Sequence, residues 1–199
     1  MEANLHVSNN KFEHMEFDYD VVIIGAGISG LYQLYRLRES GFRVCVLERG
    51  TGVGGTWYWN RYPGARFDSE SYSYGYSFSE ELLEEWNWSE HFASQPEVLR
   101  YLEYVAQKFD LRKDISFSSD VTAATYDEDR SCWGIELSSG LTYTTRILVT
   151  ALGVLSEPTF PNIEGIDSFQ GEYFHTARWP KAQVRLEGKN VAVIGTGAS

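Results

Sequence analysis

Cysteine is scarce in this chain of 199 residues, which contains only Cys45 and Cys132 and no C-x-x-C pair. Two cysteines cannot form a disulfide framework, so we expect a reducing, cytoplasmic location. Long apolar runs are also lacking, because no window approaches the roughly 18 consecutive apolar residues of a transmembrane helix. Residues 1–20 are polar and acidic, unlike a secretory signal. We therefore expect no contact with a membrane.

Basic residues are outnumbered, with 17 Lys and Arg against 28 Asp and Glu and a net charge of −11. This balance argues against nonspecific binding to nucleic acid or to anionic membranes. Histidines are few, and His6, His14 and His91 show no metal-ligand spacing, so no metal site is expected. Aromatic residues are abundant at 15%, which indicates either a large planar ligand or dense packing.

The first fifty residues have the pattern of a βαβ unit. The apolar run Tyr19–Ile24 predicts a strand buried on both faces, and Phe42–Leu47 predicts a second one. Between them, apolar residues at helical spacing from Ile28 onward predict a helix that ends at Ser40-Gly41. Together these segments predict a parallel sheet of the Rossmann type.

The rest of the chain predicts an ordered loop, two helices and a β-meander. The predicted segments are a loop over residues 50–75, helices over 79–91 and 95–109, and strands over 115–118, 121–126, 132–137, 142–150 and 191–194. The corresponding domains are a flexible tail (1–17), a dinucleotide-binding domain (18–153), a linker (154–188) and the opening strand of a second Rossmann domain (189–199).

The sequence GAGISG follows the first predicted strand directly and has the form G-x-G-x-x-G. In such a motif Gly25 permits a tight turn, Gly27 lets a pyrophosphate approach the backbone and the N-terminus of the following helix, and Gly30 allows close packing of helix on strand. Glu48 ends the second strand, 23 residues after Gly25, where a carboxylate holds ribose hydroxyls. A carboxylate there favours the unphosphorylated adenosine ribose of FAD or NAD over NADP.

A second fingerprint begins at the end of the chain, in VAVIGTGAS. It contains the start of another G-x-G pattern but lacks the helix that would follow. Two such fingerprints predict a two-dinucleotide-binding flavoprotein, with FAD in one domain and a nicotinamide in the next. The residues of the second site would be Gly195, Thr196, Gly197, Ala198 and Ser199.

Two longer motifs resemble those of Baeyer–Villiger monooxygenases. GTWYWNRYPGARFD at residues 55–68 is similar to [A/G]GxWxxxx[F/Y]P[G/M]xxxD, and FQGEYFHTARWP at residues 169–180 is similar to FxGxxxHxxxW[P/D]. They lie in the family's order between two dinucleotide fingerprints. The resemblance implies an α/β fold: a Rossmann-like FAD-binding domain with a β-meander insertion, followed by the truncated start of an NADP-binding Rossmann domain.

The resemblance also implies roles for particular residues. Asp68 would orient an arginine that lies outside this chain, and His175 would serve cofactor coupling within the linker motif. At the FAD, the resemblance implies that the pyrophosphate is held by Gly25, Gly27, Ser29 and Gly30. The other residues implied at the FAD are Gly55, Thr56 and Trp57 at the flavin end, Arg66 near the flavin and nicotinamide, Tyr74 at the flavin and Val121 at the adenine. Trp59 is interpreted as a packing residue.

The implied reaction uses FAD and NADPH to insert one atom of O2 beside a ketone carbonyl, through a peroxyflavin, giving an ester or lactone. The expectation of NADPH rather than NADH comes from the resemblance, because NADPH is the usual reductant of that family. The partners would be a ketone, O2 and polypeptide beyond Ser199. Two alternatives stay open: an N- or S-oxidising flavin monooxygenase, and a non-catalytic FAD-binding fragment.

Because the second nucleotide fingerprint is incomplete, we expect the 199-residue chain alone not to turn over NADPH with a ketone. The measurement is NADPH oxidation by the purified chain with FAD, with and without ketone. Steady ketone-dependent oxidation would contradict this expectation.

Overall fold

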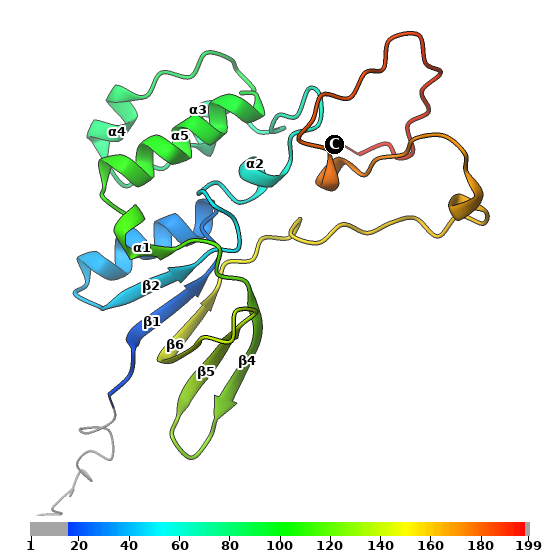
Figure 1. Cartoon of the computed structure of the whole chain (residues 1–199). Helices are drawn as coiled ribbons and strands as arrows, with labels where there is room; N and C mark the ends of the chain where they lie inside the picture. The colour runs from blue at the N-terminus through cyan, green and yellow to red at the C-terminus, as the bar shows by residue number, and fades with distance from the viewer. Residues whose placement is uncertain (1–15, 198–199) are drawn as a thin grey trace, which may run out of the picture.

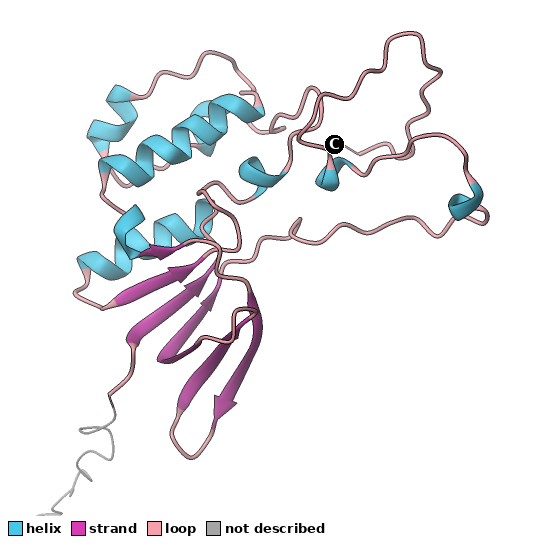
Figure 2. Cartoon of the chain, in the orientation of Figure 1, coloured by secondary structure: helices cyan, strands magenta, loops and turns pink. Residues whose placement is uncertain are grey.

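The computed structural model describes residues 16–197, and its elements follow one another as a βαβ unit, a helical segment and a β-meander (Figures 1 and 2). The strands are β1 (Tyr19–Ile24), β2 (Val44–Leu47), β3 (Ile115–Ser116), β4 (Val121–Asp127), β5 (Cys132–Leu137) and β6 (Thr142–Thr150). The helices are α1 (Ile28–Glu39), α2 (Thr56–Trp59), α3 (Ser71–Tyr74), α4 (Glu80–Glu85) and α5 (Gln95–Lys108), with 3₁₀ helices at Arg112–Asp114, Ile166–Ser168 and Thr176–Arg178.

The six strands form one mixed sheet in the order β3-β2-β1-β6-β5-β4. Strands β3, β2, β1 and β6 are parallel, whereas β6, β5 and β4 pair antiparallel as a meander. Strand β6 belongs to both parts, because Thr142–Thr145 pair with β5 and Thr145–Thr150 pair mainly with β1. The predicted Rossmann-like sheet with a β-meander is confirmed.

Alternate residues of β1 and β2 face two different hydrophobic clusters. Val21 and Ile23 pack with the helices α1 and α5, whereas Val22 packs with Ile135 and Leu137 of the meander. Burial on both faces explains why these strands are continuous apolar runs rather than alternating ones. Cys45 faces the second cluster, and burial raises the pKa of its thiol, as expected for an inert core cysteine.

The helices on the α1 side are joined by an aromatic cluster. Helix α5 buries Val98, Tyr101, Leu102 and Val105, which recur at helical spacing on one face. Around it, Trp86 meets Tyr101 edge to face and Trp88 packs on Tyr101 at a tilt. Phe78 stacks on Tyr35 of α1, with the ring centres 4.3 Å apart. Much of the aromatic content therefore packs between elements of the fold.

Three predicted elements differ from the structure. The helix expected over 79–91 ends at Glu85, because Trp86 turns to extended backbone and packs on Tyr101. The strand expected over 115–118 stops at Ser116, since Ser118 adopts φ of 54°. The loop expected over 50–75 contains the short helices α2 and α3.

The strand expected at Val191–Ile194 is also wrong for the described structure. Val193 is 83% exposed, and no other segment within residues 16–197 pairs with it. A strand needs hydrogen-bonded neighbours, and a short apolar sequence cannot form one alone. The predicted tail over 1–17 lies outside the described residues except at its last two positions.

Residues 152–197 form a long segment without a buried side chain. After β6 it runs away from the sheet and then returns toward α2 (Figure 1). Many of its apolar side chains are exposed, including Val154, Phe169 and Ile194. Polar contacts therefore matter more than apolar burial for the position of this segment.

Replacing Gly30 by alanine should destabilise the fold severely. A Cβ at residue 30 would lie 1.9 Å from the Gly25 carbonyl oxygen, so backbone would have to move. We expect Gly30→Ala to lower the free energy of unfolding by about 3 kcal/mol, measured by urea denaturation. In the matched control Gly134→Ala, the nearest atom is 3.9 Å away, and the change should stay below about 1 kcal/mol. Equal effects of the two substitutions would contradict this account.

Candidate functional site

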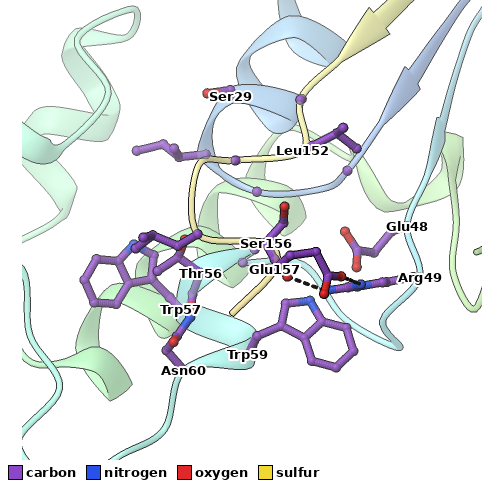
Figure 3. A pocket seen from close by; sticks show the side chains of 18 of the residues that line it. Ser29, Glu48, Arg49, Thr56, Trp57, Trp59, Asn60, Leu152, Ser156 and Glu157 are labelled. Atoms are coloured by element: carbon purple, nitrogen blue, oxygen red, sulfur yellow. Dashed lines mark hydrogen bonds and ion pairs between the residues drawn. The ribbon is translucent and has the colours of Figure 1, made fainter. Parts of the chain in front are cut away.

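A cavity of about 380 Å³ opens at the carboxyl ends of β1, β2 and β6 (Figure 3). Each of these parallel strands ends on a residue of its wall: Gly25 follows β1, Glu48 follows β2 and Ala151 follows β6. Ligands of open α/β sheets bind at this edge, where loops diverge from the strands. The cavity is therefore the candidate binding site.

The glycine turn brings bare backbone to the cavity wall. Gly25 adopts φ of 103°, and a Cβ there would lie 2.6 Å from the Ala151 carbonyl oxygen. Gly27 is the N-cap residue of α1 and has no side chain to cap the helix, and the first turn holds no acidic residue. The N–H groups of this helix terminus, together with its dipole, suit an anionic ligand.

A second glycine segment closes on the first. A Cβ built on Gly55 would lie 2.8 Å from the Gly27 Cα, and one built on Gly27 would lie 3.3 Å from the Gly55 Cα. Gly55 also adopts φ of 52°, which disfavours residues with side chains. Both residues line the cavity, so the wall is bare backbone at the point where the two segments meet. Such a cradle fits a pyrophosphate.

Glu48 is a buried carboxylate, 4% exposed, at the floor of the cavity. One of its oxygens accepts the Ala26 N–H at 2.7 Å, and the other accepts the Gly50 N–H at 2.7 Å. Each carboxylate oxygen keeps a further lone pair for a hydroxyl donor. Glu48 thus holds the glycine turn in place and presents acceptors that fit ribose hydroxyls.

Aromatic side chains form another wall. The Trp57 indole donates from Nε1 to the Tyr74 hydroxyl at 2.8 Å, and the two rings meet edge to face. Phe67 stacks on Tyr74 at 4.5 Å behind them, and burial raises the pKa of the Tyr74 phenol. This wall is apolar and rigid, which suits a planar ring.

The structure brings together nine of the residues expected at the cofactor. They are Gly25, Gly27, Ser29, Glu48, Gly55, Thr56, Trp57, Tyr74 and Val121. Gly30 lies just beneath them, in contact with the Gly25 carbonyl.

Other expected residues lie away from the cavity lining. Arg66 is exposed and donates to Glu90 at 3.1 Å and to the Phe92 carbonyl at 3.2 Å. Asp68 is exposed near it in the chain. Gly195, Thr196 and Gly197 are exposed in the final segment, and Ala198 and Ser199 lie outside the described residues.

His175 is half-buried beside the cavity rather than in its wall. Its Nδ1 accepts the Ala177 N–H at 3.1 Å, and its ring packs against Phe160 at 4.8 Å. This contact caps the 3₁₀ helix Thr176–Arg178, whose Ala177 and Arg178 do line the cavity.

Sequence reasoning missed several residues of the opening. Arg49, Trp59, Ser156, Glu157 and Arg178 all line it. Trp59 is therefore not a packing residue alone, since it is 37% exposed and faces the cavity (Figure 3). Two of them could have been suggested by their place next to predicted site residues, because Arg49 follows Glu48 and Trp59 lies two residues after Trp57. Nothing in the sequence placed residues 156–157 beside them.

The chain matches the pyridine nucleotide-disulphide oxidoreductase family over residues 22–199. The chain belongs to this family. Acetone monooxygenase (methyl acetate-forming) of Gordonia sp. (strain TY-5) is 49% identical over 180 residues, which make up 90% of this chain and 34% of the relative. The Baeyer-Villiger monooxygenase of Pseudooceanicola batsensis is 44% identical over 98% of this chain and 36% of its own length.

A solved structure of oxidised steroid monooxygenase bound to NADP superposes with a TM-score of 0.82 at 54% identity, covering 90% of this chain and 34% of that one. The chain spans about a third of the length of the curated relatives it matches. These similarities confirm the resemblance to Baeyer–Villiger monooxygenases. Within residues 16–197 no helix is long and apolar enough to cross a membrane, and no three acidic, histidine or cysteine side chains gather as a metal site.

Glu48→Gln should destabilise the fold through the two backbone N–H groups that the carboxylate accepts. A glutamine would point its NH2 group at one of these donors, leaving a buried N–H without an acceptor. We expect a loss of about 1–3 kcal/mol in the free energy of unfolding, measured by urea denaturation. The control Glu39→Gln, exposed at the end of α1, should change stability by less than about 0.5 kcal/mol. A Glu48→Gln chain as stable as this control would refute the bridging role.

Proposed function

We propose that the cavity binds FAD and that the chain is the FAD-binding part of an NADPH-dependent Baeyer–Villiger monooxygenase. The observation that carries the proposal is the convergence of three features on one cavity: the glycine turn at the start of α1, the Glu48 carboxylate, and the Trp57–Tyr74 wall. They match, in turn, a pyrophosphate, a ribose and a planar ring. FAD combines these groups in one molecule.

Different residues of the chain would bind different parts of the cofactor. Backbone N–H groups after Gly25 and Gly27 would bind the pyrophosphate, and Glu48 would accept hydrogen bonds from the adenosine ribose. Val121 would lie against the adenine, and Trp57 and Tyr74 against the flavin end. When bound, FAD would supply the redox chemistry, accepting electrons from NADPH and activating O2.

The proposed reaction converts a ketone, O2, NADPH and a proton into an ester or lactone, NADP⁺ and water. Within it Asp68 would orient an arginine from polypeptide outside this chain, which would favour developing negative charge near the flavin. The exposure of Asp68 supports such a role, because its carboxylate is open to a partner. Arg66 would lie near the flavin and nicotinamide, and residues 195–199 would begin the NADPH site.

The linker assignment for residues 154–188 and the domain start at 189–199 belong to the same proposal. Support comes from the exposed apolar side chains of Val191, Val193 and Ile194, which a further domain would cover. The free, buried thiols of Cys45 and Cys132 fit a reducing compartment, so we infer a cytoplasmic location. The net charge of −11 fits a small-molecule substrate rather than nucleic acid.

The activity is tested on the protein produced from its native gene. We expect bound FAD, and we expect acetone or cyclohexanone as probe ketones to accelerate NADPH oxidation, with ester or lactone formed in proportion. Asp68→Ala should lower ketone-dependent turnover about 100-fold or more, since an electrostatic positioning group is lost. A matched control is Asp129→Ala, which changes an exposed meander turn far from the cavity.

Other outcomes separate the alternatives. Oxygenation of an amine or sulfide without any ketone product would favour the N- or S-oxidising class. FAD binding without any NADPH oxidation would favour a non-catalytic flavin-binding protein. A protein without flavin would overturn the proposal altogether.

A further inference from the structure

An ion-pair cluster lies at the opening of the cavity and centres on Glu157. One oxygen of its carboxylate accepts from Arg49 Nη1 at 3.1 Å, and the other accepts from Arg178 Nη2 at 3.1 Å. Arg49 also donates from Nη2 to the Ser156 carbonyl at 3.0 Å. Figure 3 shows Arg49 and Glu157 reaching toward each other across the opening.

The cluster joins three segments that are distant in the sequence. Arg49 follows Glu48 at the end of β2, Glu157 lies in the segment after β6, and Arg178 ends the 3₁₀ helix next to His175. The Arg49 guanidinium also lies 5.0 Å from the centre of the Trp59 ring, which fixes its direction through a cation–π contact. Glu157 therefore links the wall of the cavity to the motif at residues 169–180.

The charges explain why Glu157 is the central member. Two guanidinium groups lie beside one carboxylate, so removing that carboxylate would leave like charges facing each other across the opening. Hydrogen bonding from Arg49 and attraction to Arg178 lower the pKa of the Glu157 carboxyl, because both guanidinium groups favour its ionised form. Exposed single pairs contribute little, but charges joined in a network and ordered by a ring contribute more.

The surroundings offer little else to hold this segment. No side chain within residues 152–197 is buried, so hydrophobic packing does not fix its position. The polar contacts of Arg49 with Ser156 and Glu157 are thus a main attachment of the segment at the cavity.

We propose that Glu157 is a positioning residue that closes the adenosine end of the cavity and couples the retention of FAD to the position of the His175–Trp179 segment. The proposal rests on the proposed binding of FAD in this cavity. Coupling of this kind is reciprocal: if the ion pairs strengthen the binding of FAD, then bound FAD must also stabilise the ion pairs.

The test measures FAD release from the protein produced from its native gene, in wild type and in Glu157→Gln. Flavin fluorescence reports release after dilution of the complex. We expect Glu157→Gln to release FAD about three- to tenfold faster at low salt, and the difference to shrink as salt screens the wild-type pairs. Arg178→Gln should show a smaller effect in the same direction, because the Arg49 pair remains.

The matched control is Glu172→Gln. Like Glu157, Glu172 lies in the segment of residues 152–197 and forms an ion pair, in its case with Lys189 of the same segment. Neither Glu172 nor Lys189 lines the cavity. Its FAD release should equal that of wild type. A general loosening of the segment would instead accelerate release in both variants.

Trypsin cleavage after Arg178 provides the second readout. Bound FAD should slow this cleavage severalfold in wild type and in Glu172→Gln. It should not slow the cleavage in Glu157→Gln, because that variant lacks the ion pairs that couple FAD binding to the segment. If the Glu157→Gln protein binds FAD and shows the same release rate and the same protection from trypsin as wild type, this inference is overturned and the proposed function is not. Absence of FAD from the wild-type protein would overturn the proposed function as well.

Discussion

Contact between bare backbone segments is the constraint on which the site depends. The Gly25 carbonyl occupies the space where a side chain at residue 30 would be, and the Cα atoms of Gly27 and Gly55 approach each other with no room for a Cβ. These contacts bring the end of β1, the start of α1 and the loop after β2 into one wall. Glu48 then joins the turn to that loop through two hydrogen bonds from backbone N–H groups. A cavity built in this way presents N–H donors, a carboxylate and rings in fixed positions before any ligand enters, which lowers the ordering cost of binding.

The two parts of the described chain are stabilised by different forces. Up to Ala151, apolar side chains pack on both faces of the sheet, and an aromatic cluster joins α1, α4 and α5. Beyond it, ion pairs and single ring contacts replace the core, as at Glu157 and at His175. Packing makes the first part a rigid support. The second part lies against the cavity through charges at the surface, and such contacts respond to ligands and to salt more readily than a core does.

Prediction from the sequence was accurate where local patterns and burial agree. Strands β1, β5 and β6 and the start of α5 were predicted at their observed bounds, because short apolar runs and the turns between them are encoded locally. The helix predicted through His91 failed at Trp86, since packing on Tyr101 outweighed helix continuation. The strand predicted at Val191–Ile194 failed for a related reason, because pairing is a property of two segments and not of one.

Local patterns were enough to predict the class of the fold, the glycine turn and the carboxylate at position 48, because these depend on spacing within a single βαβ unit. Two motifs of fixed spacing also indicated the resemblance to Baeyer–Villiger monooxygenases. The folded arrangement was needed to place Trp59, Arg49 and Glu157 together at the opening, and to place Arg66 and Asp68 outside it. Glu157 lies 108 residues from Arg49 in the chain, and no local pattern specifies a contact over that separation. The sheet specifies it, because β6 pairs beside β1 and so delivers the following segment to the same edge as Glu48 and Arg49.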